Sequence, residues 1–166
     1  KRLNALFTAA AATEPDVVVC TCSSIGEAAE SFAKEHPEAN MLRVDYPMAK
    51  YAAEHAKKVA VLATLATTVD PSVRLVERLA AEAGREVEVV SAVAEGAFAA
   101  MISGNMEAAT AAVVKTAKEK CQDADVVLLA QASMSNFADA LKEVLGDVTM
   151  LDSPSTCAAY LGEKGE

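Results

Sequence analysis

Short apolar runs alternate with helical patterns along most of the chain, and this alternation limits the possible folds more than any other feature. The apolar runs are rich in Val and Ala and lie at residues 16–22, 58–63, 86–93 and after Ala124. Runs that are apolar on both faces are typical of strands buried between layers of helices. The sequence therefore predicts an α/β fold with parallel strands joined by right-handed crossovers.

Helical patterns fill the segments between these runs. The expected helices lie at residues 2–13, from the turn after Cys22 to about residue 35, at 47–56, from about residue 71 to 83, on both sides of 103–105, before Gly146, and from Ser153, with Ser153 as N-cap and Pro154 at the first helical position.

Composition and charge exclude several classes of function. The chain has 166 residues, which suffice for one compact domain or two small lobes, and a net charge of −9. Because phosphate binding needs clustered Lys and Arg, this acidic balance argues against a nucleic-acid surface. No apolar stretch approaches the length of a membrane span and no secretory leader is recognised, so we expect a cytoplasmic protein.

The cysteines pose a choice between a disulfide framework, a metal site, a reactive thiol and plain packing. They are Cys20, Cys22, Cys121 and Cys157. The chain is too rich in core residues for a disulfide scaffold, which favours free thiols in a reducing compartment. Cys-x-Cys without a second cysteine pair, and with only His36 and His55 elsewhere, is a poor zinc set, so we predict no metal.

Small polar residues stand where several predicted strands end. These stretches are "TCSS" at 21–24, "ATLATT" at 63–68, "AQAS" at 130–133 and "DSPS" at 152–155. Ligands of open α/β sheets collect at the carboxyl ends of the strands. A binding site built from these four turns is therefore expected.

Two of the strand–turn–helix units resemble each other. "PDVVVCTCSSIGEAAE" and "ADVVLLAQASMSNFADAL" align as Asp, apolar strand, polar tetrad and helix, with Cys22 opposite Gln131. The similarity indicates either an internal repeat of two related lobes or a chance likeness between two buried units.

Six stretches together resemble the aspartate/glutamate/hydantoin racemase superfamily, whose members work without pyridoxal phosphate. In chain order they are "VVVCTCSSIG", "RVDYPMA", "KVAVLATLATT", "GAFAAMISGN", "DVVLLAQASM" and "DSPS". The resemblance implies two pseudo-symmetric parallel-sheet lobes with helices on both faces, an active site in the cleft between them, no cofactor, a small carboxylate or amino-acid-like substrate, and a homodimer. The lobes would comprise residues 1–46, residues 47–145, and a return to the first lobe over 146–166.

The resemblance also assigns roles to individual residues. In the family one thiolate removes the α-proton of the substrate and a second thiol, from the other lobe, returns a proton to the opposite face. Cys22 matches the first thiol and is the expected catalytic base. The expected substrate contacts are Ser23, Ser24, Thr64, Thr67, Thr68, Gln131, Ser133 and Ser153.

The sequence departs from the family pattern at two places. The position of the second thiol is Gln131, and an amide is neither an acid nor a base near neutral pH. At the amino end, relatives begin with a strand and an active-site loop, whereas this chain opens on a helical pattern. We therefore expect the sequence to be a truncated version of a longer protein.

A thiol at Cys22 suits α-proton chemistry on physical grounds. Helix N-termini lower the pKa of a thiol, and the backbone N–H groups of Ser23, Ser24 and Ile25 could form a small anion nest beside it. We interpret Cys20 and Cys121 as structural, and Cys157 as structural or as a second acid. Asp45 and Tyr46 could line the cleft or pack in the core.

These observations predict a cofactor-independent racemase or isomerase that acts on an amino acid or related small carboxylate. Two alternatives stay open: a one-thiol decarboxylase of a malonate-type acid, and a non-catalytic relative that binds small acids. Since no Arg or Lys stands in the polar turns, a small mono-acid, an amino acid and a hydantoin ring are all possible ligands.

Overall fold

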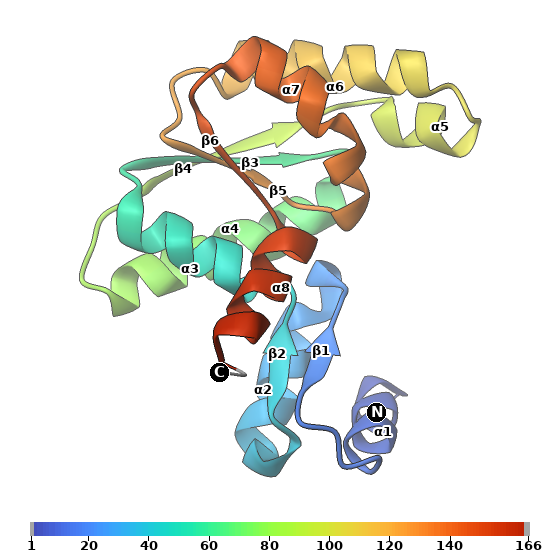
Figure 1. Cartoon of the computed structure of the whole chain (residues 1–166), viewed down its shortest axis with the longest axis vertical. Helices are drawn as coiled ribbons and strands as arrows, with labels where there is room; N and C mark the ends of the chain where they lie inside the picture. The colour runs from blue at the N-terminus through green and yellow to red at the C-terminus, as the bar shows by residue number, and fades with distance from the viewer. Residues whose placement is uncertain (1, 165–166) are drawn as a thin grey trace.

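The computed structural model describes residues 2–164, whose strands form two parallel sheets (Figure 1). The elements in chain order are α1 (Arg2–Ala11), β1 (Val18–Cys20), η1 (Ser23–Ile25), α2 (Gly26–Glu35), η2 (Pro37–Ala39), β2 (Met41–Arg43), α3 (Tyr46–His55), β3 (Lys58–Ala63), α4 (Ala66–Glu82), β4 (Glu88–Val93), α5 (Ala97–Ile102), α6 (Met106–Lys120), β5 (Val126–Leu129), η3 (Ala132–Phe137), α7 (Ala138–Leu145), β6 (Thr149–Asp152) and α8 (Ser153–Lys164).

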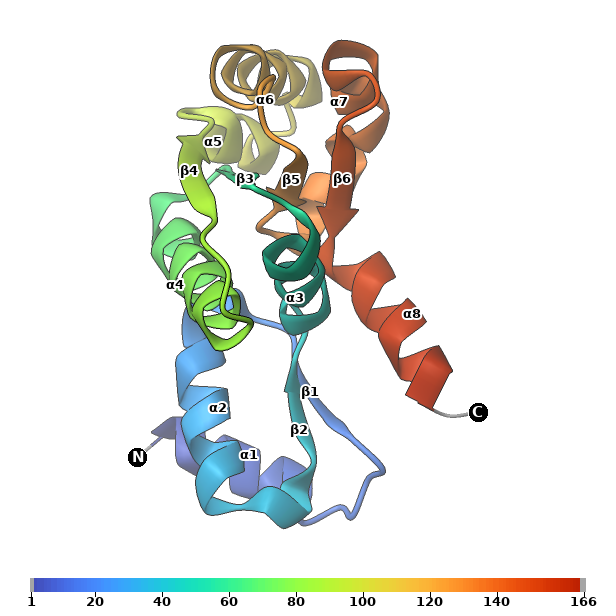
Figure 2. The ribbon, with the colours of Figure 1, turned by 90° about the vertical axis from the view of Figure 1, so that its left-hand side faces the viewer.

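The large sheet has the strand order β4-β3-β5-β6 and is parallel throughout. Its central strand β3 is buried on both faces because its side chains alternate between two cores. Val59 and Val61 pack with α3 and α4, while Ala60 and Leu62 pack with α5, α6 and α7. Figure 2 shows these two helix layers on opposite sides of the sheet. The run of apolar residues predicted to be a doubly covered strand is therefore confirmed.

The small sheet pairs β1 with β2, with Cys20 opposite Arg43. Its core is much smaller and contains Phe7 of α1 and Phe32 of α2, whose ring centroids lie 5.5 Å apart. Both strands point towards the large-sheet lobe (Figure 1), and η1, which follows β1, packs against α4. The α/β fold class with two parallel-sheet lobes, predicted from the sequence, is confirmed.

The two units that resemble each other in sequence also share their structure. Each runs from a strand through two linking residues, the second of them extended, and a 3₁₀ turn into an α-helix. The extended residues are Cys22 (φ −120°, ψ 108°) and Gln131 (φ −128°, ψ 137°). Each carbonyl accepts the N–H three residues later, from Ile25 at 3.2 Å and from Met134 at 2.9 Å. This common geometry supports the internal repeat.

Three boundaries differ from the prediction. Helix α4 begins at Ala66 rather than near residue 71, so Pro71 lies inside it; the missing N–H of Pro71 leaves only one carbonyl without its helical donor. The cap of α8 is Asp152, whose carboxylate accepts the N–H of Ser155 at 2.8 Å, rather than Ser153. Strand β6 joins the large sheet, beyond the boundary predicted at residue 145.

Candidate active site

The strand ends bring the predicted site residues to one side of the large sheet. Adjacent parallel strands end in register, with Leu62 paired to Leu129 and Leu129 paired to Asp152. Thr64, Gln131 and Ser153 come just after these ends. Because β1 and β2 point at the same region, the turn that carries Cys22 approaches from the small-sheet lobe.

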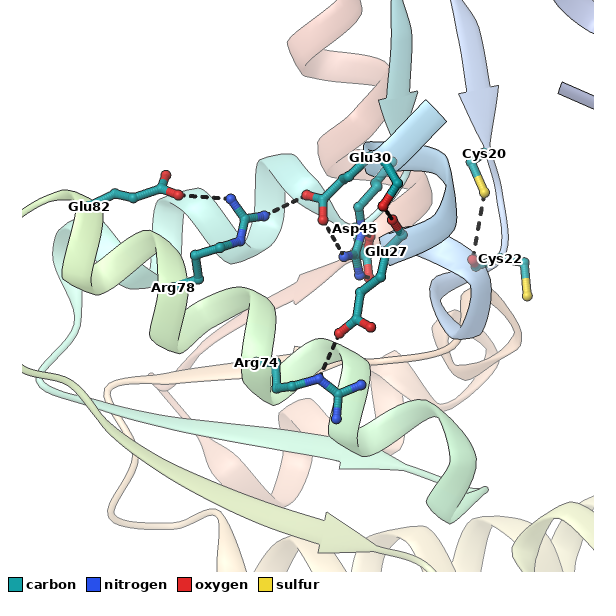
Figure 3. Close-up of polar contacts among 10 residues, drawn as sticks. Cys20, Cys22, Glu27, Glu30, Asp45, Arg74, Arg78 and Glu82 are labelled. Atoms are coloured by element: carbon teal, nitrogen blue, oxygen red, sulfur yellow. Dashed lines mark hydrogen bonds and ion pairs between the residues drawn. The ribbon is translucent and has the colours of Figure 1, made fainter. Parts of the chain in front are cut away.

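Cys22 lies two residues beyond β1, at the entry to η1. Of the four cysteines, all within the described residues and all free thiols, Cys22 is exposed and the other three are buried. Figure 3 shows its sulfur turned away from that of Cys20, whose Sγ–H donates to the Cys22 carbonyl at 3.7 Å. Cys22 is thus the thiol that a small molecule can reach.

The buried cysteines have the structural character that the sequence predicted for Cys20 and Cys121. Burial raises the pKa of Cys20, which belongs to the small-sheet core, and of Cys157 in α8. Burial also raises the pKa of Cys121, at the end of α6, to about 11. A buried thiol with a raised pKa forms little thiolate near neutral pH, so these three are poor bases and poor nucleophiles.

Gln131 is joined to Thr64 by two hydrogen bonds. Its Oε1 accepts the backbone N–H of Thr64 at 2.6 Å and the hydroxyl of Thr64 at 2.9 Å. Because a backbone N–H only donates, its partner must be the amide oxygen, and the NH₂ group of Gln131 is directed away from Thr64. The amide of Gln131 is therefore held in place through its oxygen.

The other predicted substrate contacts divide into exposed and buried side chains. Ser24, Thr67 and Ser133 are exposed, whereas Ser23 and Ser153 are buried. Thr67 and Thr68 belong to the first turn of α4, not to a loop, because this helix begins early. The hydroxyl of Thr68 donates to the Leu65 carbonyl at 2.8 Å, so its proton is already used in a hydrogen bond at the start of α4.

One expectation about groups near Cys22 needs correction, and one open alternative is resolved. The N–H of Ile25 donates to the Cys22 carbonyl, so it is occupied within the turn and does not belong to an open anion nest. Asp45 is fully buried and paired with Arg43, which resolves its alternatives in favour of packing.

The sequence reasoning missed Arg43, a charged residue that is 4% exposed. Its Nε and Nη2 donate to the two carboxylate oxygens of Asp45 at 2.9 and 2.8 Å. Burial alone lowers the pKa of Arg43, but the hydrogen bonds and charge of Asp45 outweigh it and raise the pKa. The pattern Arg-x-Asp inside "RVDY" was the available signal, since opposite charges two residues apart are close enough to pair where the chain turns from β2 into α3.

Ion pairs join α2 of the small-sheet lobe to α4 of the other lobe (Figure 3). Arg74 Nε lies 2.6 Å from a carboxylate oxygen of Glu27, and Arg78 Nη2 lies 2.5 Å from Glu30. Glu30 also accepts from Arg43 at 3.3 Å. The helix that follows the Cys22 turn is therefore bridged to the helix that follows the Thr64 turn.

A cavity of about 450 Å³ lies beside β2, and its lining includes Glu30, Arg43, Tyr46 and Tyr160. None of the residues predicted to bind substrate lines this cavity. Within residues 2–164, His, Cys, Asp and Glu side chains form no group of three suited to a metal ion. Among the helices of the same residues, none is long and apolar enough to cross a membrane.

The chain thus combines a parallel α/β fold of two lobes with an exposed thiol just beyond the end of a strand. The sequence model of the Asp/Glu/Hydantoin racemase family matches residues 2–161. The chain therefore belongs to this family. A search of curated protein sequences finds no match.

Solved structures of racemases and of a decarboxylase have the same fold. Glutamate racemase from Francisella tularensis, in complex with D-glutamate, is 15% identical with a TM-score of 0.73, over 97% of this chain and 61% of its own. Allantoin racemase from Klebsiella pneumoniae is 13% identical with a TM-score of 0.66, and the match covers 97% of this chain and 64% of the allantoin racemase chain. A variant of arylmalonate decarboxylase with sulfate is 14% identical with a TM-score of 0.58, and the match covers 95% of this chain and 70% of the decarboxylase chain.

The chain spans less than two thirds of the length of the glutamate racemases that it resembles. At these identities the likeness concerns the fold.

Proposed function

We propose that this protein is a cofactor-independent enzyme that moves the α-proton of an amino acid or related small carboxylate, with the thiolate of Cys22 as the base. The observation that carries the proposal is the exposure of Cys22 at a strand-end turn while the other three cysteines are buried. Membership of the racemase family and the shared fold support the same chemistry.

The proposed reaction at Cys22 is a proton transfer. The Cys22 thiolate takes the α-hydrogen of the substrate as a proton, and the electron pair of the C–H bond passes into the carboxylate, which becomes an enediolate. Hydrogen-bond donors placed at that carboxylate stabilise the developing charge. The exposed hydroxyls of Ser24, Thr67 and Ser133 and the NH₂ group of Gln131 are the donors that we assign to this task.

Gln131 favours a second candidate, the decarboxylation of a malonate-type acid. In that reaction the bond between the α-carbon and one carboxylate breaks, carbon dioxide leaves, and the Cys22 thiol gives its proton to the resulting enediolate. One thiol suffices, and an amide on the opposite side only holds the remaining carboxylate. The fold shared with arylmalonate decarboxylase is compatible with this candidate. The homodimer and the cytoplasmic location expected from the sequence stay predictions.

Proton exchange in deuterated water tests the proposal directly. The chain is incubated with a panel of amino acids, hydantoins and substituted malonates, and loss of the α-proton signal or of a carboxylate is followed by proton NMR. Cys22→Ser removes the base, and Cys157→Ala serves as the matched control because it removes a buried thiol.

Exchange that disappears in Cys22→Ser and persists in Cys157→Ala would support the assignment of the base. Racemic product would indicate a racemase, and retention of one enantiomer would indicate one-sided protonation. Binding of small acids without any exchange or decarboxylation would contradict the enzyme and support a non-catalytic relative with Gln131 in place of a thiol.

A further inference from the structure

Arg43 occupies the centre of a buried polar cluster between β2, α2 and α3. Its side chain is 3% exposed, and the carboxylate of Asp45 that binds it is 0% exposed. Two parallel N–H···O bonds fix the guanidinium plane, a geometry that Lys cannot reproduce. A charged group held this firmly can serve as a rigid support for its neighbours.

The guanidinium lies against the backbone of Gly26, the first residue of α2. A Cβ atom at Gly26 would lie 2.7 Å from Arg43 Nη2 and closer still to Nε and Cζ. Any residue other than glycine would therefore displace the guanidinium or the helix start. Gly26 has helical backbone angles, so the requirement for glycine comes from this contact and not from strain.

The other end of the loop that carries Cys22 is held beside Arg43. Cys20 lies opposite Arg43 in the small sheet. The N–H of Val44, the residue after Arg43, donates to the Cys20 carbonyl at 3.0 Å. The backbone of Val44, next to Arg43, thus anchors the loop at Cys20, and the side chain of Arg43 supports the loop at Gly26. The exposed Cys22 lies between these two points.

We propose that Arg43 is a positioning residue for Cys22: its guanidinium holds the Gly26 end of the Cys20–Gly26 loop, whose Cys20 end is bound to the backbone beside Arg43, and so fixes where the thiol points. The catalytic meaning of this inference rests on the proposed function. Asp45 keeps the guanidinium in place, because a buried charge without a partner would draw water or move to the surface.

Glu30 extends this support to the other lobe. It accepts from Arg43 Nη1 at 3.3 Å and from Arg78 of α4 at 2.5 Å, so one carboxylate joins two arginines from different lobes. Helix α4 starts just after Thr64, and η1 packs on α4. Arg43 therefore fixes the Cys22 loop relative to the Thr64 and Gln131 side of the site as well.

The test compares Gly26→Ala with Gly162→Ala in the full chain. Both change a helical glycine to alanine, but a Cβ at Gly162 would meet nothing within 4 Å. Alanine is the better helix former, so loosening in Gly26→Ala must come from the clash with Arg43. The readouts are amide hydrogen exchange of residues 22–26, the pH profile of Cys22 alkylation, and α-proton exchange.

We expect amide exchange of residues 22–26 to rise by about tenfold or more in Gly26→Ala, with the alkylation profile of Cys22 shifted and β3 unchanged. Gly162→Ala should match the parent chain. Arg43→Met combined with Asp45→Asn, which leaves no unpaired buried charge, should give the same effect. Adding Gly26→Ala to that double variant should add little, because the clash no longer exists.

Additive effects of the Gly26 and Arg43 changes, or an unchanged loop in Gly26→Ala, would overturn the inference. A variant that loosens β3 as well would show a merely structural role and would also overturn it. Amide exchange and alkylation need no substrate. If the parent chain moves no α-proton but the loop responds as expected, the proposed function fails and the positioning role of Arg43 stands.

Discussion

Alkylation with iodoacetamide at pH 8 is expected to modify Cys22 in the native chain long before any other cysteine. Cys22 is exposed, whereas Cys20, Cys121 and Cys157 are 8%, 0% and 5% exposed. The thiolate is the reacting species, so both access and ionisation control the rate.

The size of the difference follows from the structure of the Cys121 site. Burial raises the pKa of Cys121 to about 11, so at pH 8 only about 0.1% of it is thiolate, against about 10% for a thiol with a pKa of 9.0. Reagent also reaches this site only after the fold opens. With an unfolding free energy of at least about 5 kcal/mol, the open fraction is about 10⁻⁴. We therefore expect Cys121 to react at least about a thousandfold more slowly than an accessible cysteine.

Intact-mass spectrometry over time, followed by peptide mapping, measures the prediction. One adduct should form per chain, at Cys22, and four should form in guanidinium chloride. Cys20, in a strand of only three residues, should react second. Modification of Cys121 at a rate comparable to Cys22, or uniformly slow modification of all four in the native chain, would refute the reasoning.

Three further outcomes are expected. Thr64→Val, which removes one of two donors to Gln131, should lower the free energy of unfolding by about 0.5–1.5 kcal/mol in urea denaturation. Stability linked to Cys121 is present below its ordinary pKa of 9.0 and should be lost as pH rises towards 11, by up to about 3 kcal/mol, measured as the difference from Cys121→Ala. Glu27 and Arg74 form an exposed ion pair, and either Glu27→Arg or Arg74→Glu alone should lower the free energy of unfolding by at most about 1 kcal/mol. The double variant, in which the two charges are exchanged, should recover most of that loss.

Each of these outcomes has a control. Thr67→Val changes an exposed threonine in the first turn of α4 and should change the free energy of unfolding by less than about 0.5 kcal/mol. An equal loss of stability in both threonine variants would contradict the role of the hydrogen bond. A constant stability difference between the parent chain and Cys121→Ala from pH 8 to 11 would contradict the linkage. Single charge changes that cost the same in 1 M salt would exclude an ion-pair effect.

Much of the fold followed from local sequence patterns. Strand β3 and the break between α5 and α6 lie where the sequence predicted them, because a doubly apolar run and a Gly-Asn turn are strong local signals. The start of α4 was misplaced since Pro usually marks a first turn, whereas here Val69, which precedes Pro71, packs in the core and the helix begins at Ala66.

The candidate site was predictable in part. The equivalent places of Cys22 and Gln131 in two like units follow from the strand–turn–helix pattern. The hydrogen bonds between Thr64 and Gln131 and the cluster around Arg43 join residues far apart in the chain or on different faces. Such contacts depend on the register of the strands, which single-sequence patterns do not specify.

The exposed thiol belongs to the lobe with the smaller core, and this has a consequence for the search for a ligand. The hydrophobic cluster around Phe7 and Phe32 is much smaller than either cluster of the large sheet, so residues 18–35 should open first, well below the global unfolding free energy. A ligand that touches both lobes would suppress this local opening by the same mass action that stabilises the whole fold. Protection of residues 18–35 from amide exchange can therefore rank unknown small acids as ligands before any reaction is known.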